Sequence, residues 1–163
     1  MKRKNNYSKP AAVSPMDAAL SYLTGRMRTV REVEDKLDDL QYGEGDILAT
    51  VERLKELNLL NDEAYAREFV RSRLATKPVS RQKLYMDLRA HKVPEEWIEV
   101  ALNELPSETE GNNALAVAQK YWRQMAALEE PVRRERVLRR LTGRGFSVEA
   151  SLAAIRQAAE EEF

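Results

Sequence analysis

Apolar residues recur at spacings of three and four along most of this chain, which is the period of an α-helix. Ile47, Val51 and Leu54 form one such run, and similar runs follow after short polar breaks. No stretch alternates apolar and polar positions for long enough to indicate a β-strand. The pattern therefore predicts an all-α fold.

Helix starts are marked by side chains that can accept a hydrogen bond from the free amides of a first turn. Ser14 and Ser147 stand at such starts, and Thr29 and Ser107 each precede a glutamate by three residues, the spacing of a capping box. Together with the periodic runs, these signals predict helices over about 15–27, 30–41, 46–58, 62–76, 81–91, 95–105, 108–127, 131–142 and 147–161.

The apolar positions also repeat over a longer period. Leu37, Ile47 and Leu54 recur as Leu88, Ile98 and Leu105, 51 positions later, and Leu88, Val93 and Leu102 recur as Leu141, Phe146 and Ile155, 53 positions later. The third copy is looser, because Ser151 falls where an apolar residue is expected. The pattern predicts a basic disordered tail at 1–14 and three tandem three-helix repeats at 15–60, 61–106 and 107–163.

A unit of three short helices is not expected to bury its apolar face alone. We therefore expect the three repeats to stack into one elongated, curved body with a continuous core. Such a stack offers a long surface suited to binding an extended macromolecule, and the chain is expected to be a monomer.

Composition limits the classes of function. Lys plus Arg number 27 and Asp plus Glu number 27, so a net charge of zero argues against binding of bare nucleic acid by bulk charge. The chain has no cysteine and no run of about 20 apolar residues that would span a membrane. The basic start of the chain lacks the apolar run of a secretory signal. These features together indicate a cytoplasmic protein without membrane contact.

No pattern of residues indicates catalysis, a metal or a cofactor. His91 is the only histidine, and its place at a predicted helix end beside Lys92 indicates an exposed side chain. Adjacent acids such as Glu95 and Glu96 point about 100° apart on a helix and do not form a shared site. We therefore expect a binding protein and not an enzyme.

Two clusters of basic residues are the candidate partner-binding sites. The first comprises Arg71, Arg73, Lys77, Arg81, Lys83 and Arg89, and the second comprises Arg133, Arg134, Arg136, Arg139, Arg140 and Arg144. Each is either a solvated face paired with nearby acids or a surface that contacts phosphates or an acidic protein. In the second cluster, helical spacing predicts one shared face for Arg133, Arg136 and Arg140. The adjacent rings of Tyr121 and Trp122 lie on neighbouring faces, so one is expected to be partly exposed.

The middle of the chain is similar to the central signature of the RecX family. The resemblance lies in the segment 60–73, which opens Leu-Asn-Asp-Glu-Ala-Tyr-Ala-Arg, then in Lys77 and in Lys83 to Leu88. It continues through 18–37 in the first repeat and Arg144 to Ser147 near the end, and it spans about 16–158. The family usually has glycine where this chain has Ser80 and Lys92. Lys92 in the same left-handed turn would cost about 1 kcal/mol, so we expect that turn to differ locally.

The resemblance implies a regulator of RecA, the bacterial recombinase. Such a protein consists of three-helix repeats, has no cofactor, binds RecA and the RecA filament on single-stranded DNA, and inhibits recombinase, ATPase and co-protease activity. Weak direct contact with DNA is compatible with this role. The alternative is a stand-alone helical DNA-binding module, in which 80–102 forms a helix-turn-helix. The neutral charge, and Glu95 and Glu96 in the would-be recognition helix, argue against it.

Overall fold

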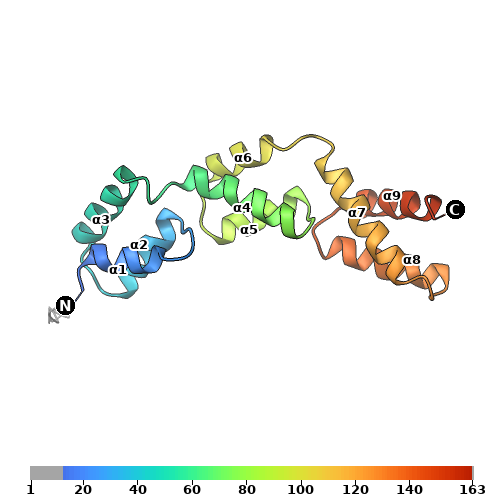
Figure 1. The fold of residues 1–163 in the computed structure, drawn as a ribbon, viewed down its shortest axis with the longest axis horizontal. Helices are drawn as coiled ribbons and strands as arrows, with labels where there is room; N and C mark the ends of the chain where they lie inside the picture. Colours follow the sequence, from blue (N-terminus) through green and yellow to red (C-terminus); the bar gives the residue numbers. More distant parts are fainter. Residues whose placement is uncertain (1–12, 163) are drawn as a thin grey trace, which may run out of the picture. The chain divides into compact units, whose positions relative to one another are not determined.

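The computed structural model describes residues 13–162, and these residues form α-helices and no strand (Figure 1). The helices are α1 (Pro15–Leu23), α2 (Val30–Asp39), α3 (Glu44–Glu56), α4 (Asp62–Thr76), α5 (Arg81–Ala90), α6 (Glu95–Asn103), α7 (Thr109–Gln124), α8 (Glu130–Thr142) and α9 (Val148–Glu160). The all-α prediction is confirmed. Residues 1–12 of the predicted tail lie outside the described part of the chain.

The helices group by threes, and we call α1–α3 repeat 1, α4–α6 repeat 2 and α7–α9 repeat 3. The described residues form two compact units, one ending at Asn61 and the other beginning at Asp62. The first holds repeat 1 and the second holds repeats 2 and 3. The first helix ends at Leu23, four residues earlier than predicted, because Thr24 is extended and Gly25 has a φ of 78°.

Four of the helix starts are capped by a hydroxyl. Ser14, Thr29, Ser80 and Ser147 each accept a hydrogen bond from a first-turn amide, and Thr29 and Glu32 complete the predicted capping box. The box predicted between Ser107 and Glu110 is wrong, because α7 begins only at Thr109. Glu110 instead accepts a hydrogen bond of 3.0 Å from the backbone amide of Arg81, at the start of α5.

Each repeat buries its own core. The cores gather around Leu37 and Leu54 in repeat 1, Leu88 and Ile98 in repeat 2, and Leu141 and Ile155 in repeat 3, all fully buried. Leu37, Leu88 and Leu141, which the sequence places at equivalent positions, each lie in the core of their own repeat. The prediction of one continuous core is wrong for repeats 2 and 3, because their buried side chains form separate clusters within the same compact unit.

The second helix of each repeat ends in the same turn. Gln41, Lys92 and Gly145 hold the left-handed conformation, with φ values of 66°, 61° and 88°. The amide of the next residue donates a hydrogen bond to the carbonyl of Leu37, Leu88 or Leu141. This is the Schellman geometry that closes a helix C-terminus. The expectation that the turn at Lys92 differs locally is therefore wrong.

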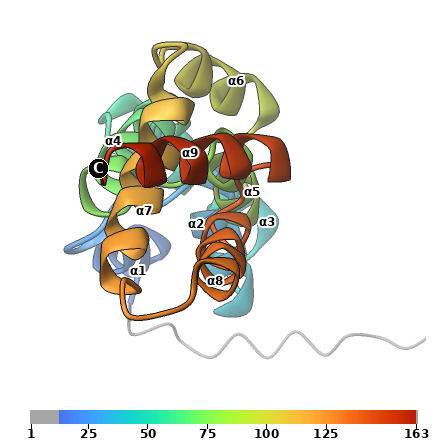
Figure 2. The same cartoon turned by 90° about the vertical axis from the view of Figure 1, so that its right-hand side faces the viewer.

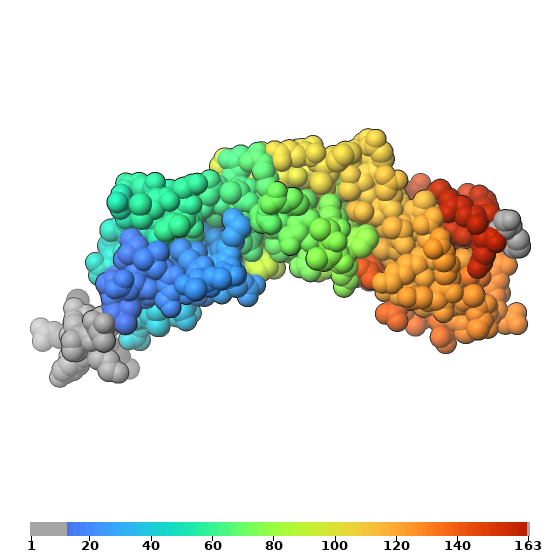
Figure 3. Space-filling model, in the orientation of Figure 1, coloured from blue at the N-terminus to red at the C-terminus, as the bar shows by residue number. Residues whose placement is uncertain are grey.

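Repeats 2 and 3 meet where the loop before α5 lies against the end of α8. The backbone amide of Ser80 donates to the carbonyl of Arg144 over 3.2 Å, and the Asn113 side chain donates to the carbonyl of Val79 over 3.4 Å. Figure 3 shows the green atoms of repeat 2 against the orange atoms of repeat 3. A Cβ at Gly145 would collide with the Ser80 hydroxyl and lie 2.9 Å from the Cβ of Lys83.

Repeat 3 is closed by a buried arginine. In this repeat α7 packs on both α8 and α9, and Figure 2 shows α9 lying across α7. Arg133 is 8% exposed, with its guanidinium carbon 4.0 Å from the centre of a Trp122 ring. The guanidinium donates to the carbonyl of Trp122 and, through two bonds of 2.8 Å, to the carboxylate of Glu162. Arg133 thereby joins α7, α8 and the end of α9.

Substituting Gly145→Ala is expected to destabilise the second compact unit by about 2–4 kcal/mol, because an L residue there adds left-handed strain to the overlap with Ser80. Both tryptophans, Trp97 and Trp122, lie in this unit, so urea unfolding followed by tryptophan fluorescence reports on it. Gly111→Ala is the control, because it lies in α7 with open space around a Cβ and is expected to keep or raise stability. Equal midpoints for the two variants would contradict the account of the junction.

The ion pair between Arg133 and Glu162 is expected to make the stability of the second compact unit depend on pH. The hydrogen bond from Arg133 lowers the pKa of Glu162 below its usual value of 4.5, and the Trp122 indole and the charge of Arg133 lower it further, while desolvation opposes the shift. A lowered pKa adds stability that is present above the unfolded value and lost as pH falls through the folded one. Glu162→Gln should therefore unfold at lower urea than the wild type at pH 7.

That difference should begin to shrink as the pH falls below about 4.5, where the carboxyl of the unfolded chain takes up a proton, and it should vanish below the lowered pKa of the folded protein, where the wild-type carboxyl is protonated as well. Glu160→Gln serves as the control, because the Glu160 side chain forms no hydrogen bond or ion pair with residues 13–162, and it should leave the unfolding midpoint unchanged. A gap between wild type and Glu162→Gln that is constant with pH would show that the ion pair adds nothing.

Candidate partner-binding surface

Half of the first basic cluster is engaged by carboxylates of the same repeat. Arg71 pairs with Glu68, Lys83 lies 2.5 Å from Asp87, and Arg73 lies 3.7 Å from the same aspartate. These pairs are the solvated face that was one of the two interpretations of the cluster. Arg73 and Lys83 share a single carboxylate, so the pairs offset only part of the positive charge of the cluster.

Arg81 has a structural position within the first cluster. Its guanidinium donates to the carbonyls of Leu102 over 2.7 Å and Leu105 over 2.9 Å, at the end of α6. The last carbonyls of a helix have no partner within the helix, so a cation there satisfies them and complements the helix dipole. Arg81 therefore fastens the start of α5 to the end of α6.

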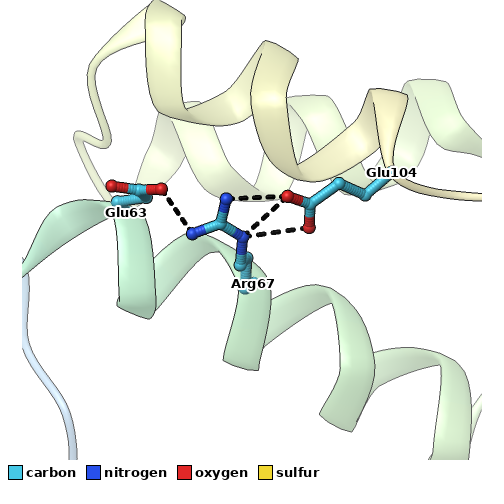
Figure 4. A network of polar contacts seen from close by, with 3 residues as sticks. All are labelled: Glu63, Arg67 and Glu104. Atoms are coloured by element: carbon cyan, nitrogen blue, oxygen red, sulfur yellow. Dashed lines mark hydrogen bonds and ion pairs between the residues drawn. The ribbon is translucent and has the colours of Figure 1, made fainter.

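A second arginine of repeat 2, which the sequence did not single out, is also fully occupied. Arg67 donates to both oxygens of Glu104 and also to Glu63, which ties α4 to the end of α6 (Figure 4). The hydrogen bond from Arg67 lowers the pKa of Glu104 below its usual value. Of the first cluster, Lys77 and Arg89 have no carboxylate partner among the described residues, and Arg89 lies 5.8 Å from the centre of the Tyr85 ring.

The second cluster does not form the predicted shared face. Arg133 stands four residues before Val137 and eight before Leu141, so it lies on the buried stripe of α8 with them. Within the helix, Arg134 pairs with Glu130 and Arg139 pairs with Glu135, each over 2.7 Å. Arg136 and Arg140 remain exposed, without a carboxylate partner among residues 13–162.

The remaining cations gather around one ring. The guanidinium carbons of Arg140 and Arg144 lie 5.4 and 5.6 Å from the centre of the Tyr121 ring, and the Lys120 ammonium lies 5.7 Å from it. Arg144 also donates to the Tyr121 hydroxyl over 3.0 Å and to the carbonyl of Pro78 over 3.4 Å. Lys77 is exposed and directly precedes Pro78 in the chain. We call Lys77, Lys120, Tyr121, Arg140 and Arg144 the Tyr121 surface.

The electrostatics of this surface favour an anion. The hydrogen bond from Arg144 holds the pKa of Tyr121 below its usual value of 10.0, against partial desolvation, and the charges of Arg144, Lys120 and Arg140 lower it further. No described carboxylate forms an ion pair with these cations. Arginine guanidinium groups bind phosphate and carboxylate groups through paired donors, so the surface can hold an anionic polymer or an acidic protein face.

The structure shows which of the two adjacent rings, Tyr121 or Trp122, reaches the surface. Trp122 is buried and Tyr121 is half-buried at the helix surface, as the expectation of one partly exposed ring requires. Lys120 was missed from the sequence because it stands alone between apolar residues and glutamine, away from any basic run. Only the folding of α8 beside α7 brings it near Arg140.

Other candidate chemistry is sparse in the described part of the chain. No group of three or more histidine and acidic side chains gathers there in a way that could hold a metal ion. His91 is half-buried against Tyr65 and Phe69, with ring centres 5.9 and 5.4 Å away, so the expectation of an exposed side chain is wrong. None of the described helices is both long and apolar enough to cross a membrane.

Comparison with known proteins places the three repeats in one family. The models for the first, second and third three-helix domains of RecX match residues 16–54, 61–102 and 108–155. A Regulatory protein RecX from Streptomyces lividans is 32% identical over 143 residues, covering 88% of this chain and 76% of that protein. The one from Prosthecochloris aestuarii is 32% identical over 146 residues, covering 90% and 91%.

The fold is also similar to a solved structure. The crystal structure of RecX from Lactobacillus salivarius matches with a TM-score of 0.77 and 26% sequence identity, covering 89% of this chain and 94% of that one. The domain models follow one another in the order of the repeats, and the relatives are matched over most of their length. The chain belongs to the RecX family of regulatory proteins.

Proposed function

We propose that this protein binds RecA and the RecA filament on single-stranded DNA and inhibits the recombinase, ATPase and co-protease activities of RecA. The observation that carries the proposal is the match of all three repeats to the RecX domains, since the matched relatives are named regulatory proteins. It acts as a cytoplasmic monomer, without a cofactor and without chemistry of its own.

The Tyr121 surface supports binding to the filament. Its cations are held in place by a ring and by backbone carbonyls instead of by carboxylates, so little internal pairing has to be broken when an anionic partner binds. Arg136 and Arg89 add exposed positive charge on the same compact unit. Contact with DNA in the filament is part of the proposal, as a weak addition to the contact with RecA.

Inhibition follows only if the protein binds one state of RecA more tightly than another. A ligand shifts a conformational equilibrium by no more than its difference in affinity for the two states. A few kcal/mol of difference per bound copy is enough to move most of a population. The protein therefore stabilises an inactive filament geometry or a dissociated RecA subunit.

The alternative of a stand-alone DNA-binding module is opposed by the charge on α6. In a helix-turn-helix formed by α5 and α6, the second helix would enter the major groove between phosphates. The exposed residues of α6 include Glu95, Glu96 and Glu99, and Glu95 also accepts a hydrogen bond of 2.7 Å from Tyr85. Acidic side chains facing phosphates would repel duplex DNA.

The proposal is tested by the ATPase and strand-exchange activities of RecA on single-stranded DNA. A stoichiometric amount of this protein is expected to lower both. Arg136→Ala and Arg140→Ala should fold normally and inhibit more weakly at low salt, with a difference that shrinks as salt is raised, because they remove charges that have no carboxylate partner and that salt would screen. Arg139→Ala is the control on the same helix, since its charge is already paired with Glu135.

Unchanged RecA activities at stoichiometric amounts would remove the proposal. Equal inhibition by all three variants at every salt concentration would leave the proposal that the protein regulates RecA intact, but it would exclude Arg136 and Arg140 from the contact.

A further inference from the structure

The three repeats place an aromatic ring at the same position of their first helix. Tyr22, Phe69 and Tyr121 each stand three residues after a fully buried alanine, which is Ala19, Ala66 or Ala118. All three rings are half-buried at the surface of their repeat. A small residue at the buried position lets the neighbouring helix approach closely, and the ring then lies beside the second helix.

In repeats 1 and 3 the second helix supplies a cation to this ring from the same position. The Lys36 ammonium lies 5.7 Å from the centre of the Tyr22 ring, and the Arg140 guanidinium lies 5.4 Å from that of Tyr121. Both residues directly precede a fully buried leucine of the second helix, Leu37 or Leu141. The repeat register therefore produces the same arrangement twice.

Further cations complete each arrangement. Arg28 lies 4.1 Å from the centre of the Tyr22 ring and donates to the carbonyl of Tyr22, while Lys120 and Arg144 lie near Tyr121. Within residues 13–162, none of these side chains forms an ion pair with a carboxylate. We call Tyr22, Arg28 and Lys36 the first station. The third station is Tyr121 with Lys120, Arg140 and Arg144.

Repeat 2 has the opposite charge at this position of the second helix. Asp87 stands where repeats 1 and 3 have Lys36 and Arg140, directly before the buried Leu88. It pairs with Lys83 over 2.5 Å and with Arg73, whose guanidinium carbon lies 5.2 Å from the centre of the Phe69 ring. Both cations of the middle station are thus paired with a carboxylate of the protein itself, which offsets part of their charge.

From this arrangement we infer that the first and third stations are two binding sites for single-stranded nucleic acid, and that Asp87 keeps the middle one silent. Each station offers what a single strand needs, which is cations for a phosphate and an aromatic ring beside them for a base. An acidic protein face would use the cations but has no need of a ring at both places. Asp87 shows that the position itself accommodates a carboxylate and its cations together.

Two weak stations on one chain act together. Once one station holds a strand, the other meets it at a raised local concentration, so the overall affinity exceeds that of either alone. The inference rests on the direct DNA contact within the proposed function, and not on the contact with RecA. Its test therefore uses this protein alone with a fluorescent oligothymidylate, so that its failure leaves the RecA proposal untouched.

The loss experiment compares charges of equal size on the same helix or repeat. Lys36→Gln and Arg140→Gln should each weaken binding and lower the slope of log affinity against log salt by about 0.7, the value for one phosphate contact of a single strand. The matched controls are Lys55→Gln and Arg139→Gln, whose cations already pair with Glu52 and Glu135. The controls should keep the wild-type slope.

The gain experiment restores the missing cation. Asp87→Lys should tighten oligothymidylate binding and raise the salt slope, because it adds a cation beside Phe69 and releases Arg73 and Lys83. Glu99→Lys makes the same change of charge on the exposed face of α6 and should have a much smaller effect. Asp87→Asn, with Glu99→Gln as its control, releases the two cations without adding a third and serves if Asp87→Lys fails to fold.

Three outcomes overturn the inference. In the first, Asp87 and Glu99 variants gain affinity equally, and bulk charge alone governs binding. In the second, Lys36→Gln and Arg140→Gln bind like their controls. In the third, those variants bind the oligonucleotide normally yet lose their effect on RecA, and the stations contact protein.

Discussion

The turn after the second helix of each repeat sets the rest of the structure. Gln41, Lys92 and Gly145 take a left-handed conformation, and the following amide closes the helix onto the carbonyl of a fully buried leucine. A non-glycine residue in that conformation is unfavourable by about 1 kcal/mol, yet two of the three repeats accept it. The reason is that the turn fixes the leucine in the core, and with it the direction of every other side chain on the second helix.

The turn also fixes the direction of the residue directly before that leucine, and this residue bears on function. In repeats 1 and 3 its side chain, Lys36 or Arg140, lies near the ring on the first helix, and in repeat 2 it is Asp87, which pairs with the Arg73 that lies near the ring. The same repeat thus carries unpaired cations in two copies and cations paired with Asp87 in the third, with the same turn in the backbone. The repeats therefore share one fold, and they differ in how they contact a partner because the charge at this position differs.

Much of this architecture could be predicted from the sequence. Helical periodicity predicted the helices, hydroxyl caps marked four of their starts, and the recurrence of Leu37, Leu88 and Leu141 indicated the repeat. The missed features depend on contacts between distant segments. Glu110 caps a helix other than its own, and Gly145 packs on Ser80. The separate cores of repeats 2 and 3 were also unexpected, because periodicity shows which face is apolar but not what covers it.

Charge was the least predictable property for the same reason. Both basic clusters are conspicuous in the sequence, but Arg81 and Arg133 are used inside the fold and Arg71, Arg134 and Arg139 are paired with neighbouring acids. Whether an arginine is available depends on its place relative to a core stripe or a carbonyl. Lys120 and Lys36, by contrast, lie outside both clusters and reach a ring only in the folded chain.

The central claim is that this member of the RecX family acts on RecA through the cation-bearing rings of its repeats. Electron cryo-microscopy of the protein bound to a RecA filament on single-stranded DNA tests it most directly. The account predicts density in which Tyr121 and its cations lie against the filament and its DNA. A complex in which Tyr121, Arg140 and Lys36 all face solvent would contradict it.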